Sequence, residues 1–182
     1  STRGQVAASD PVLRAGIEQA WYALHIAKDP NPPERVTVWV QRNDDESLRS
    51  KCKNEFQIRK VRSTHQSFDS TTAEQLHELY ERVIDLGAHP NQQGVLTSMN
   101  LSETEEEITY QVGLLAPKVI PVLFALKTTV EVAIGMLKVY QLIFPERFKI
   151  MSLDDEIKAL VGKLNLDFKA YGAQLKQQEG NY

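Results

Sequence analysis

Hydrophobic residues recur at three- and four-residue steps along most of this chain, a spacing that places them on one side of a helix. The clearest case is residues 76–91, whose packed side is formed by Leu76, Leu79, Tyr80, Val83, Leu86 and Gly87. The same spacing predicts further helices at residues 10–28, 34–42, 43 onward, 114–144 and 152 onward. We therefore expect a mainly α protein, a bundle of five or six helices.

Proline and acidic residues set the limits of several predicted helices. Asp10 followed by Pro11 predicts the start of the first helix, with the acid as cap and the proline in the first turn. Pro145 ends the apolar segment 114–144, because proline cannot continue a helix without losing a hydrogen bond. Residues 36–40 are also rich in β-branched side chains, so a strand is the alternative to a helix there.

Residues 43–72 are expected to form one helix followed by a polar linker at 64–72. The inward positions of that helix are Leu48, Cys52, Phe56 and Val61. Ser70 or Thr71 is expected to cap the next helix, with Glu74 completing a capping box.

The period of the pattern changes after residue 94. Residues 95–99 and 107–112 read as two short strands joined by a turn at 100–106, since Ile108, Tyr110 and Val112 alternate with polar residues. We therefore expect a short β-hairpin insertion at about 95–112. A lone hairpin is marginally stable, so it needs helices or a partner chain to pack on.

The segment 114–144 is the longest apolar stretch, and its helix is expected to begin after Pro117 or at Pro121. Charged residues interrupt it too often for a membrane span, which needs about 20 apolar residues. A helix this apolar is hard to cover within one chain, so we expect one face to form a homodimer contact.

Composition places the chain among ordinary globular proteins. Its 182 residues are 42% hydrophobic and 25% charged, with a net charge of −3. We expect a lead-in at 1–9, a single helical domain at 10–178 and a frayed tail at 179–182. The lone Cys52 permits no internal disulfide and no signal peptide is visible, so we expect a cytoplasmic protein.

The negative net charge argues against general affinity for nucleic acid. Positive charge is nonetheless concentrated at residues 49–62, which is either a solvated helix face or a modest anion- or RNA-facing patch. No phosphate-binding glycine loop, nucleophile elbow or zinc-binding spacing is present, so no cofactor and no metal are expected. His65 and His77 are expected at the surface, and His25 at the edge of the bundle.

Candidate chemistry is concentrated where the helix containing Leu76 ends. Arg82, Asp85 and His89 follow one another at helical spacing, and Asn91 comes just after Pro90, which marks the exit from the helix. A guanidinium beside an imidazole suits acid–base work next to a phosphate.

The same residues also have interpretations without chemistry. Glu78, Arg82 and Asp85 form the spacing of a surface ion-pair ladder. His89 at a helix end suits a cap on the last carbonyl groups, and Asn91 suits a turn.

The Arg82-x6-His89 spacing near the end of a core helix resembles the signature of HEPN domains, which are all-helical bundles. The run Ala88-His89-Pro90-Asn91 is also similar to the helix ends of some bacterial domains of unknown function. The resemblance covers residues 10–145. Active HEPN proteins are metal-independent ribonucleases, usually dimeric. In such an enzyme His89 would transfer the proton and Arg82 would hold the phosphate.

Two hypotheses lead, and a third, a small-ligand sensor built around the apolar helix at 114–144, has no polar constellation to support it. Because no specific catalytic motif is present, the first is a HEPN-like, non-catalytic helical interaction domain, one part of a larger bacterial protein. The alternative is a metal-independent ribonuclease using Arg82 and His89, with Asp85 and Asn91 nearby. A homodimer, and a further protein partner, are expected for the first; RNA is the partner implied by the second.

Overall fold

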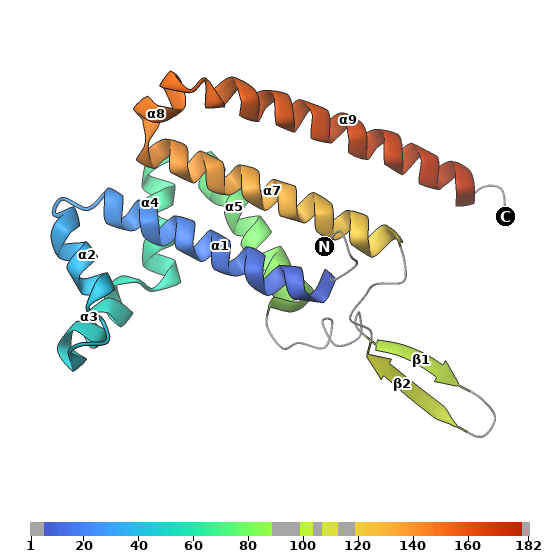
Figure 1. Cartoon of the computed structure of the whole chain (residues 1–182), viewed down its shortest axis with the longest axis horizontal. Helices are drawn as coiled ribbons and strands as arrows, with labels where there is room; N and C mark the ends of the chain where they lie inside the picture. The colour runs from blue at the N-terminus through green and yellow to red at the C-terminus, as the bar shows by residue number, and fades with distance from the viewer. Residues whose placement is uncertain (1–5, 89–98, 104–106, 113–118, 180–182) are drawn as a thin grey trace. The chain divides into compact units, whose positions relative to one another are not determined.

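The computed structural model describes residues 6–88, 99–103, 107–112 and 119–179, and these are mainly helical (Figure 1). They form eight α-helices, one π-helical turn and one pair of short strands. The chain divides into two compact units, Ser1–Ile143 and Phe144–Tyr182. Two more helices are present than the expected six. The segment expected to be one helix and a linker contains two helices, and a further short helix occupies residues 145–150.

The first unit contains six of these α-helices. Their bounds are α1 Val6–Ala27, α2 Pro32–Val40, α3 Glu46–Glu55, α4 Ile58–Phe68, α5 Ser70–Val83 and α7 Val119–Ile143. The π-helical turn η1, Ile84–Ala88, continues α5. The helix expected at 34–42 is confirmed as α2, and the strand alternative is wrong.

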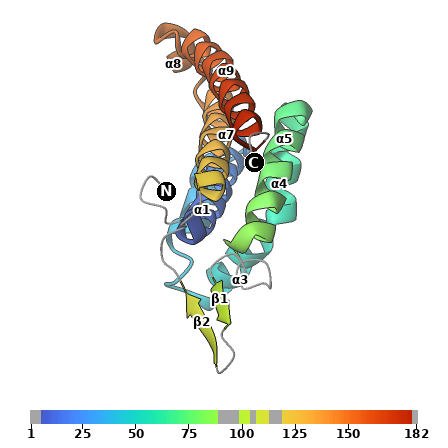
Figure 2. The ribbon, with the colours of Figure 1, turned by 90° about the vertical axis from the view of Figure 1, so that its right-hand side faces the viewer.

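Helix α1 lies at the centre of this unit and packs against α7, α4, α5, α2 and η1. Helices α1 and α7 run side by side, and α4 with α5 lies along their flank (Figure 2). The fully buried side chains of α1 include Ile17, Trp21 and Leu24, which meet Leu76 of α5 and Val132 of α7 in one hydrophobic cluster. Burial of such side chains stabilises the fold by about 1.5–3 kcal/mol each before the entropic costs.

Two glycines lie where a side chain from a neighbouring helix packs closely on the helix backbone. A Cβ on Gly135 of α7 would lie 2.7 Å from Leu76 Cδ1, and a Cβ on Gly16 of α1 would lie 3.1 Å from Met136 Sδ. Leu76 of α5 therefore fills the space beside Gly135 that a side chain on α7 would need.

The start of α1 differs from the expectation. The helix begins at Val6, so Pro11 lies inside it and Asp10 is not its cap. Asp10 is instead buried, and burial raises the pKa of its carboxyl to about 6. Residues 6–9 give the helix an extra turn before the proline.

The expected linker at 64–72 is wrong: residues 64–68 belong to α4, and Asp69 alone separates α4 from α5. The cap of α5 is Asp69, whose carboxylate accepts a hydrogen bond from the backbone N–H of Thr72 at 3.0 Å. The cap therefore lies one residue before the expected Ser70. Asp69 can take this position because a carboxylate is as good a cap as a hydroxyl and also interacts favourably with the helix dipole.

Strands β1, Met99–Glu103, and β2, Ile108–Val112, pair antiparallel, with Leu101 opposite Tyr110. The first strand therefore lies four residues later than the expected 95–99, and residues 95–98 lie outside the described residues.

Helix α7 corresponds to the long apolar segment and ends at Ile143, just before Pro145, as expected. Its buried positions include Ala125, Thr128, Val132 and Val139, while Phe124 is exposed. Among the helices that the structure describes, none combines the length and apolar character that crossing a bilayer requires.

The second unit consists of two helices, α8, Pro145–Ile150, and α9, Leu153–Glu179, which pack against each other. Ser152 joins them with a positive φ of 53°, a conformation that few non-glycine residues adopt. Phe148 of α8 is buried, whereas Leu160 and Tyr171 of α9 are exposed. The spacing of apolar residues predicts six inward positions in this helix: Ile157, Leu160, Val161, Leu164, Phe168 and Tyr171. The prediction is wrong for Leu160 and Tyr171.

Candidate functional site

Arg82 lies in the last turn of α5 and faces α7. Its Nη1 donates a hydrogen bond to Glu131 Oε2 at 3.0 Å, and Lys127 Nζ lies 3.5 Å from the other carboxylate oxygen of Glu131. The side chains of Arg82 and Glu131 are 37% and 28% exposed. One carboxylate thus serves two cations and joins α5 to α7.

This pairing differs from the surface ladder that the spacing suggested. Arg82 pairs with Glu131 on another helix and not with Glu78 one turn earlier. The competing contact wins because Glu131 is already held near Lys127 by α7, so less side-chain entropy is lost when Arg82 joins the pair.

The end of α5 is not a regular α-helix. Ile84–Ala88 forms a π-helical turn, with hydrogen bonds to the fifth residue along the chain. The α-helical spacing that put Asp85 on the stripe of Arg82 therefore stops at Val83. Asp85 is exposed within this turn, and His89 and Asn91, the other two candidates, lie outside the described residues.

A cluster around His25 was missed by the sequence analysis. His25 Nδ1 lies 2.7 Å from Thr64 Oγ1 of α4, and its Nε2 meets Nη1 of Arg35 of α2. Burial lowers the pKa of His25 to about 4, and the Arg35 guanidinium acts in the same direction. The neutral ring then donates from Nδ1 to Thr64 and accepts at Nε2 from Arg35.

Arg35 extends this cluster to two acidic groups. Its Nη2 lies 2.5 Å from Asp29 Oδ2, and its Nε lies 3.9 Å from Glu55 Oε2. Helices α1, α2, α3 and α4 are thereby connected through one guanidinium and one imidazole. The only sequence signal was the buried edge position of His25, because its partners come from segments far along the chain.

A small hollow of about 90 Å³ lies beside this cluster. Its lining residues are Asp29, Glu34, Arg35, Val38, Lys51 and Glu55. Lys51 Nζ is 2.8 Å from Glu34 Oε1, so the charges in the hollow are paired with each other. The volume is well below the roughly 300 Å³ of a small-molecule site.

The remaining histidines differ in burial. His65 is fully buried, so its expected surface position is wrong; its Nδ1 accepts a hydrogen bond from Trp21 Nε1 at 3.1 Å. The helix α4 turns this residue inward four positions after the buried Val61. His77 is 27% exposed, and its Nδ1 lies 3.4 Å from Glu81 Oε1.

The basic segment at 49–62 lies on α3 and α4. Lys53, Arg59, Lys60 and Arg62 form no ion pair with any other residue in the described part of the chain. Lys51 and Arg49 are paired with Glu34 and Glu46. In the ranges that the structure describes, no three metal-ligating side chains come together.

Comparison of this chain with protein-family models, curated proteins and solved structures finds no match.

Proposed function

We propose that this chain is a non-catalytic helical interaction domain with a HEPN-like order of helices, working as a homodimer and contacting a further protein partner. The observation that carries the proposal is the pairing of Arg82 with Glu131. The residue that would hold a phosphate in a HEPN-type enzyme is used to join two helices.

The electrostatics of that pair support a structural role. A carboxylate at 3.0 Å neutralises most of the charge that an incoming phosphate would experience. Moving the guanidinium from Glu131 to a phosphate would break a contact between α5 and α7. It would also leave the Glu131 carboxylate close to the phosphate, so that two anions repel each other. Lys127 alone would then have to balance Glu131.

Apolar surface supports an interaction role. Large hydrophobic side chains are exposed in both units, among them Val12, Val40, Phe68, Ile150, Met151 and Leu166. The hollow beside Arg35 is too small and too well neutralised internally to hold a typical ligand. Contacts with another chain are therefore the use that the surface favours.

The alternative is the metal-independent ribonuclease that uses Arg82 and His89. Its supporting observation is the π-helical turn directly after α5, since such turns occur frequently at functional sites. Arg82 is also 37% exposed, so its guanidinium remains open to solvent on one side.

An RNA cleavage assay without added metal separates the two functions. The wild type, Arg82→Ala and His89→Ala are compared with Arg59→Ala, a matched control that removes an exposed, unpaired arginine from α4. We expect no cleavage by any of the four. Cleavage by the wild type and Arg59→Ala that is lost in the other two, with circular dichroism unchanged, replaces the interaction domain with the nuclease.

A further inference from the structure

One row of apolar side chains runs along α9. It consists of Leu153, Ile157, Leu160, Leu164, Phe168 and Tyr171, and we call it the α9 row. Each residue of its first half has a counterpart eleven positions later: Leu153 and Leu164, Ile157 and Phe168, Leu160 and Tyr171. An eleven-residue repeat is close to the natural pitch of a straight helix, so the row stays nearly parallel to the axis.

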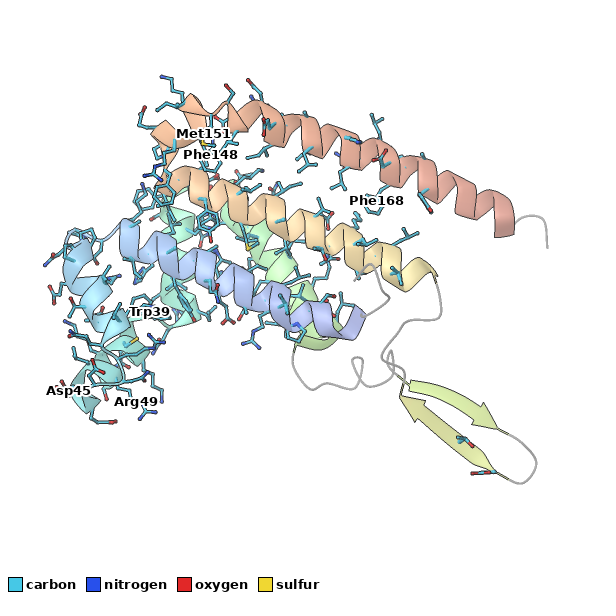
Figure 3. All side chains as sticks on the ribbon, viewed as in Figure 1. Trp39, Asp45, Arg49, Phe148, Met151 and Phe168 are labelled. Carbon is cyan, nitrogen blue, oxygen red and sulfur yellow. The ribbon has the colours of Figure 1, made fainter. Side chains whose placement is uncertain are left out.

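The row is narrow, and the apolar Val161 lies at its edge, about 20° beyond Phe168. At about 100° per residue, its six members fall within about 80° of arc, and Leu166 lies on the opposite side. Phe168 projects from one side of α9 (Figure 3). Leu160 and Tyr171 are 45% and 47% exposed, and Leu166 is 69% exposed.

The second unit does not cover the row by itself. Helix α8 has six residues and is about 9 Å long, whereas the 27 residues of α9 extend for about 40 Å. Packing of α8 on α9 therefore reaches only part of the row.

We propose that the α9 row is a self-association surface, on which α9 of a second copy of this chain packs antiparallel. This inference rests on the proposed interaction function and names its partner. The argument for a second copy is self-complementarity: when Leu164 of one copy lies opposite Leu164 of the other, Ile157 lies opposite Tyr171 and Leu160 lies opposite Phe168. Every member of the row except Leu153 then meets a member of the same row.

Charge fixes the orientation. Lys163 and Asp167 lie on the same flank of the row, and neither forms an ion pair with another residue that the structure describes. In the antiparallel register around Leu164, Lys163 of one copy and Asp167 of the other lie two residues, or about 3 Å, apart along the helix axis, within reach of an ion pair. The two-fold axis produces this pair twice. Flanking charges of this kind set orientation and partner choice in helix pairs.

The row is about 27 Å long from Leu153 to Tyr171, so it buries less surface than the roughly 800 Å² per partner of a standard interface. We therefore expect a reversible, concentration-dependent equilibrium between monomer and dimer.

Sedimentation equilibrium of the full chain over a concentration series tests the row. We expect a monomer–dimer equilibrium for the wild type and a dissociation constant at least about tenfold higher for Leu160→Asp, since one buried carboxylate per copy opposes association. Leu166→Asp, the same change on the opposite side of α9, is the matched control and is expected to keep the wild-type constant.

A mixing experiment tests the orientation. Lys163→Asp makes both positions of this pair acidic and Asp167→Lys makes both basic, so each variant alone is expected to dissociate more readily than the wild type. An equal mixture is expected to recover association, because each copy then supplies the opposite charge.

A wild type that stays monomeric overturns the proposal. Protection of the row's amides from hydrogen exchange in that monomer would then assign the row to contacts within the chain. A dimer equally unaffected by Leu160→Asp and Leu166→Asp also overturns it, and a mixture no stronger than its components overturns the antiparallel orientation. The RNA readout does not depend on α9. A wild type that stays monomeric also removes the homodimer from the proposed function, whereas a dimer that Leu160→Asp leaves intact overturns the α9 row alone, so the two failures are distinguishable.

Discussion

Trp21 and His65 lie 44 residues apart in the sequence and meet inside the core, where the indole Nε1 donates a hydrogen bond to His65 Nδ1 at 3.1 Å. Because Nδ1 accepts this bond, the imidazole is neutral and carries its proton on Nε2. That Nε2 is buried and has no hydrogen-bond partner among the described residues. Protonating the ring would place a charge beside an indole N–H in an apolar surrounding.

This contact predicts a pH dependence of stability. Burial lowers the pKa of His65 in the folded state below its ordinary value of 6.5. The unfolded chain therefore binds the proton first, and the free energy of unfolding should fall as pH decreases below about 6.5. His25, with a pKa of about 4, contributes in the same direction. Burial raises the pKa of Asp10 to about 6, so the folded chain binds this proton before the unfolded chain does. Asp10 therefore opposes the two histidines between about pH 6 and its ordinary pKa of 3.8.

The variant His65→Leu isolates this effect. Chemical unfolding from pH 7.5 to 5.5 should show a smaller loss of stability on acidification for His65→Leu than for the wild type. At pH 7.5 the variant should be less stable by about 1–3 kcal/mol, because the Trp21 N–H loses its acceptor. Equal slopes in the two proteins would refute a neutral, buried His65.

The Arg82–Glu131 pair should contribute a measurable but modest coupling. A double-mutant cycle with Arg82→Met and Glu131→Gln is expected to give about 0.5–1 kcal/mol, since both side chains are partly exposed. The pair Asp155–Lys158, with side chains 84% and 78% exposed, is the matched control and should give a coupling near zero. Coupling no larger than in this control would remove the structural role assigned to Arg82.

The cap of α5 offers a test of a one-residue difference. Asp69→Ala should reduce the free energy of unfolding by about 1 kcal/mol, because the backbone N–H of Thr72 loses its acceptor. Ser70→Ala, the cap that the sequence suggested, should change it by much less. Denaturant unfolding of both variants decides the assignment, and a larger loss for Ser70→Ala would reverse it.

Two glycine-to-alanine changes should have opposite outcomes. Gly162 of α9 has no atom within 4 Å of an added Cβ, so Gly162→Ala should stabilise α9 by about 0.5–1 kcal/mol through helix propensity. Gly135→Ala gains the same propensity but presses on the buried Leu76, which costs about 1–3 kcal/mol. It should therefore be neutral or destabilising.

Amide hydrogen exchange resolved along the chain measures both changes, since it reports α9 and α7 separately. Slower exchange in α9 for Gly162→Ala and unchanged or faster exchange in α7 for Gly135→Ala is the expected result. Stabilisation of α7 by Gly135→Ala would mean that the Leu76 side chain moves aside without a loss of folding free energy.

Periodicity alone identified most of the helices, and the discrepancies have physical causes. The pattern missed two helices, α4 and the six-residue α8. In α4, Ile58, Val61 and His65 are spaced for a helix, but the pattern is visible only if a histidine is counted as a core residue. At Asp10 the sequence carries a good cap signal, yet tertiary burial of the carboxyl accompanies a longer helix. A local signal of this kind competes with packing against residues that are distant in the sequence, and a short stretch of sequence does not reveal that packing.

The candidate site was less predictable than the fold. The position of Arg82 at the end of a helix followed from the pattern, but its partner Glu131 is 49 residues away. The same holds for His25 and Thr64, 39 residues apart. The π-helical turn at Ile84–Ala88 also changed the angular relation of the residues after Val83, which an α-helical wheel could not anticipate.

Cys52 is the chain's single cysteine, and it is buried on the inward side of α3, where burial raises the pKa of its thiol. A disulfide reagent can therefore reach the sulfur only when α3 separates from its neighbours. The rate of that reaction in the natural sequence measures how often this corner of the first unit opens, without any engineered label.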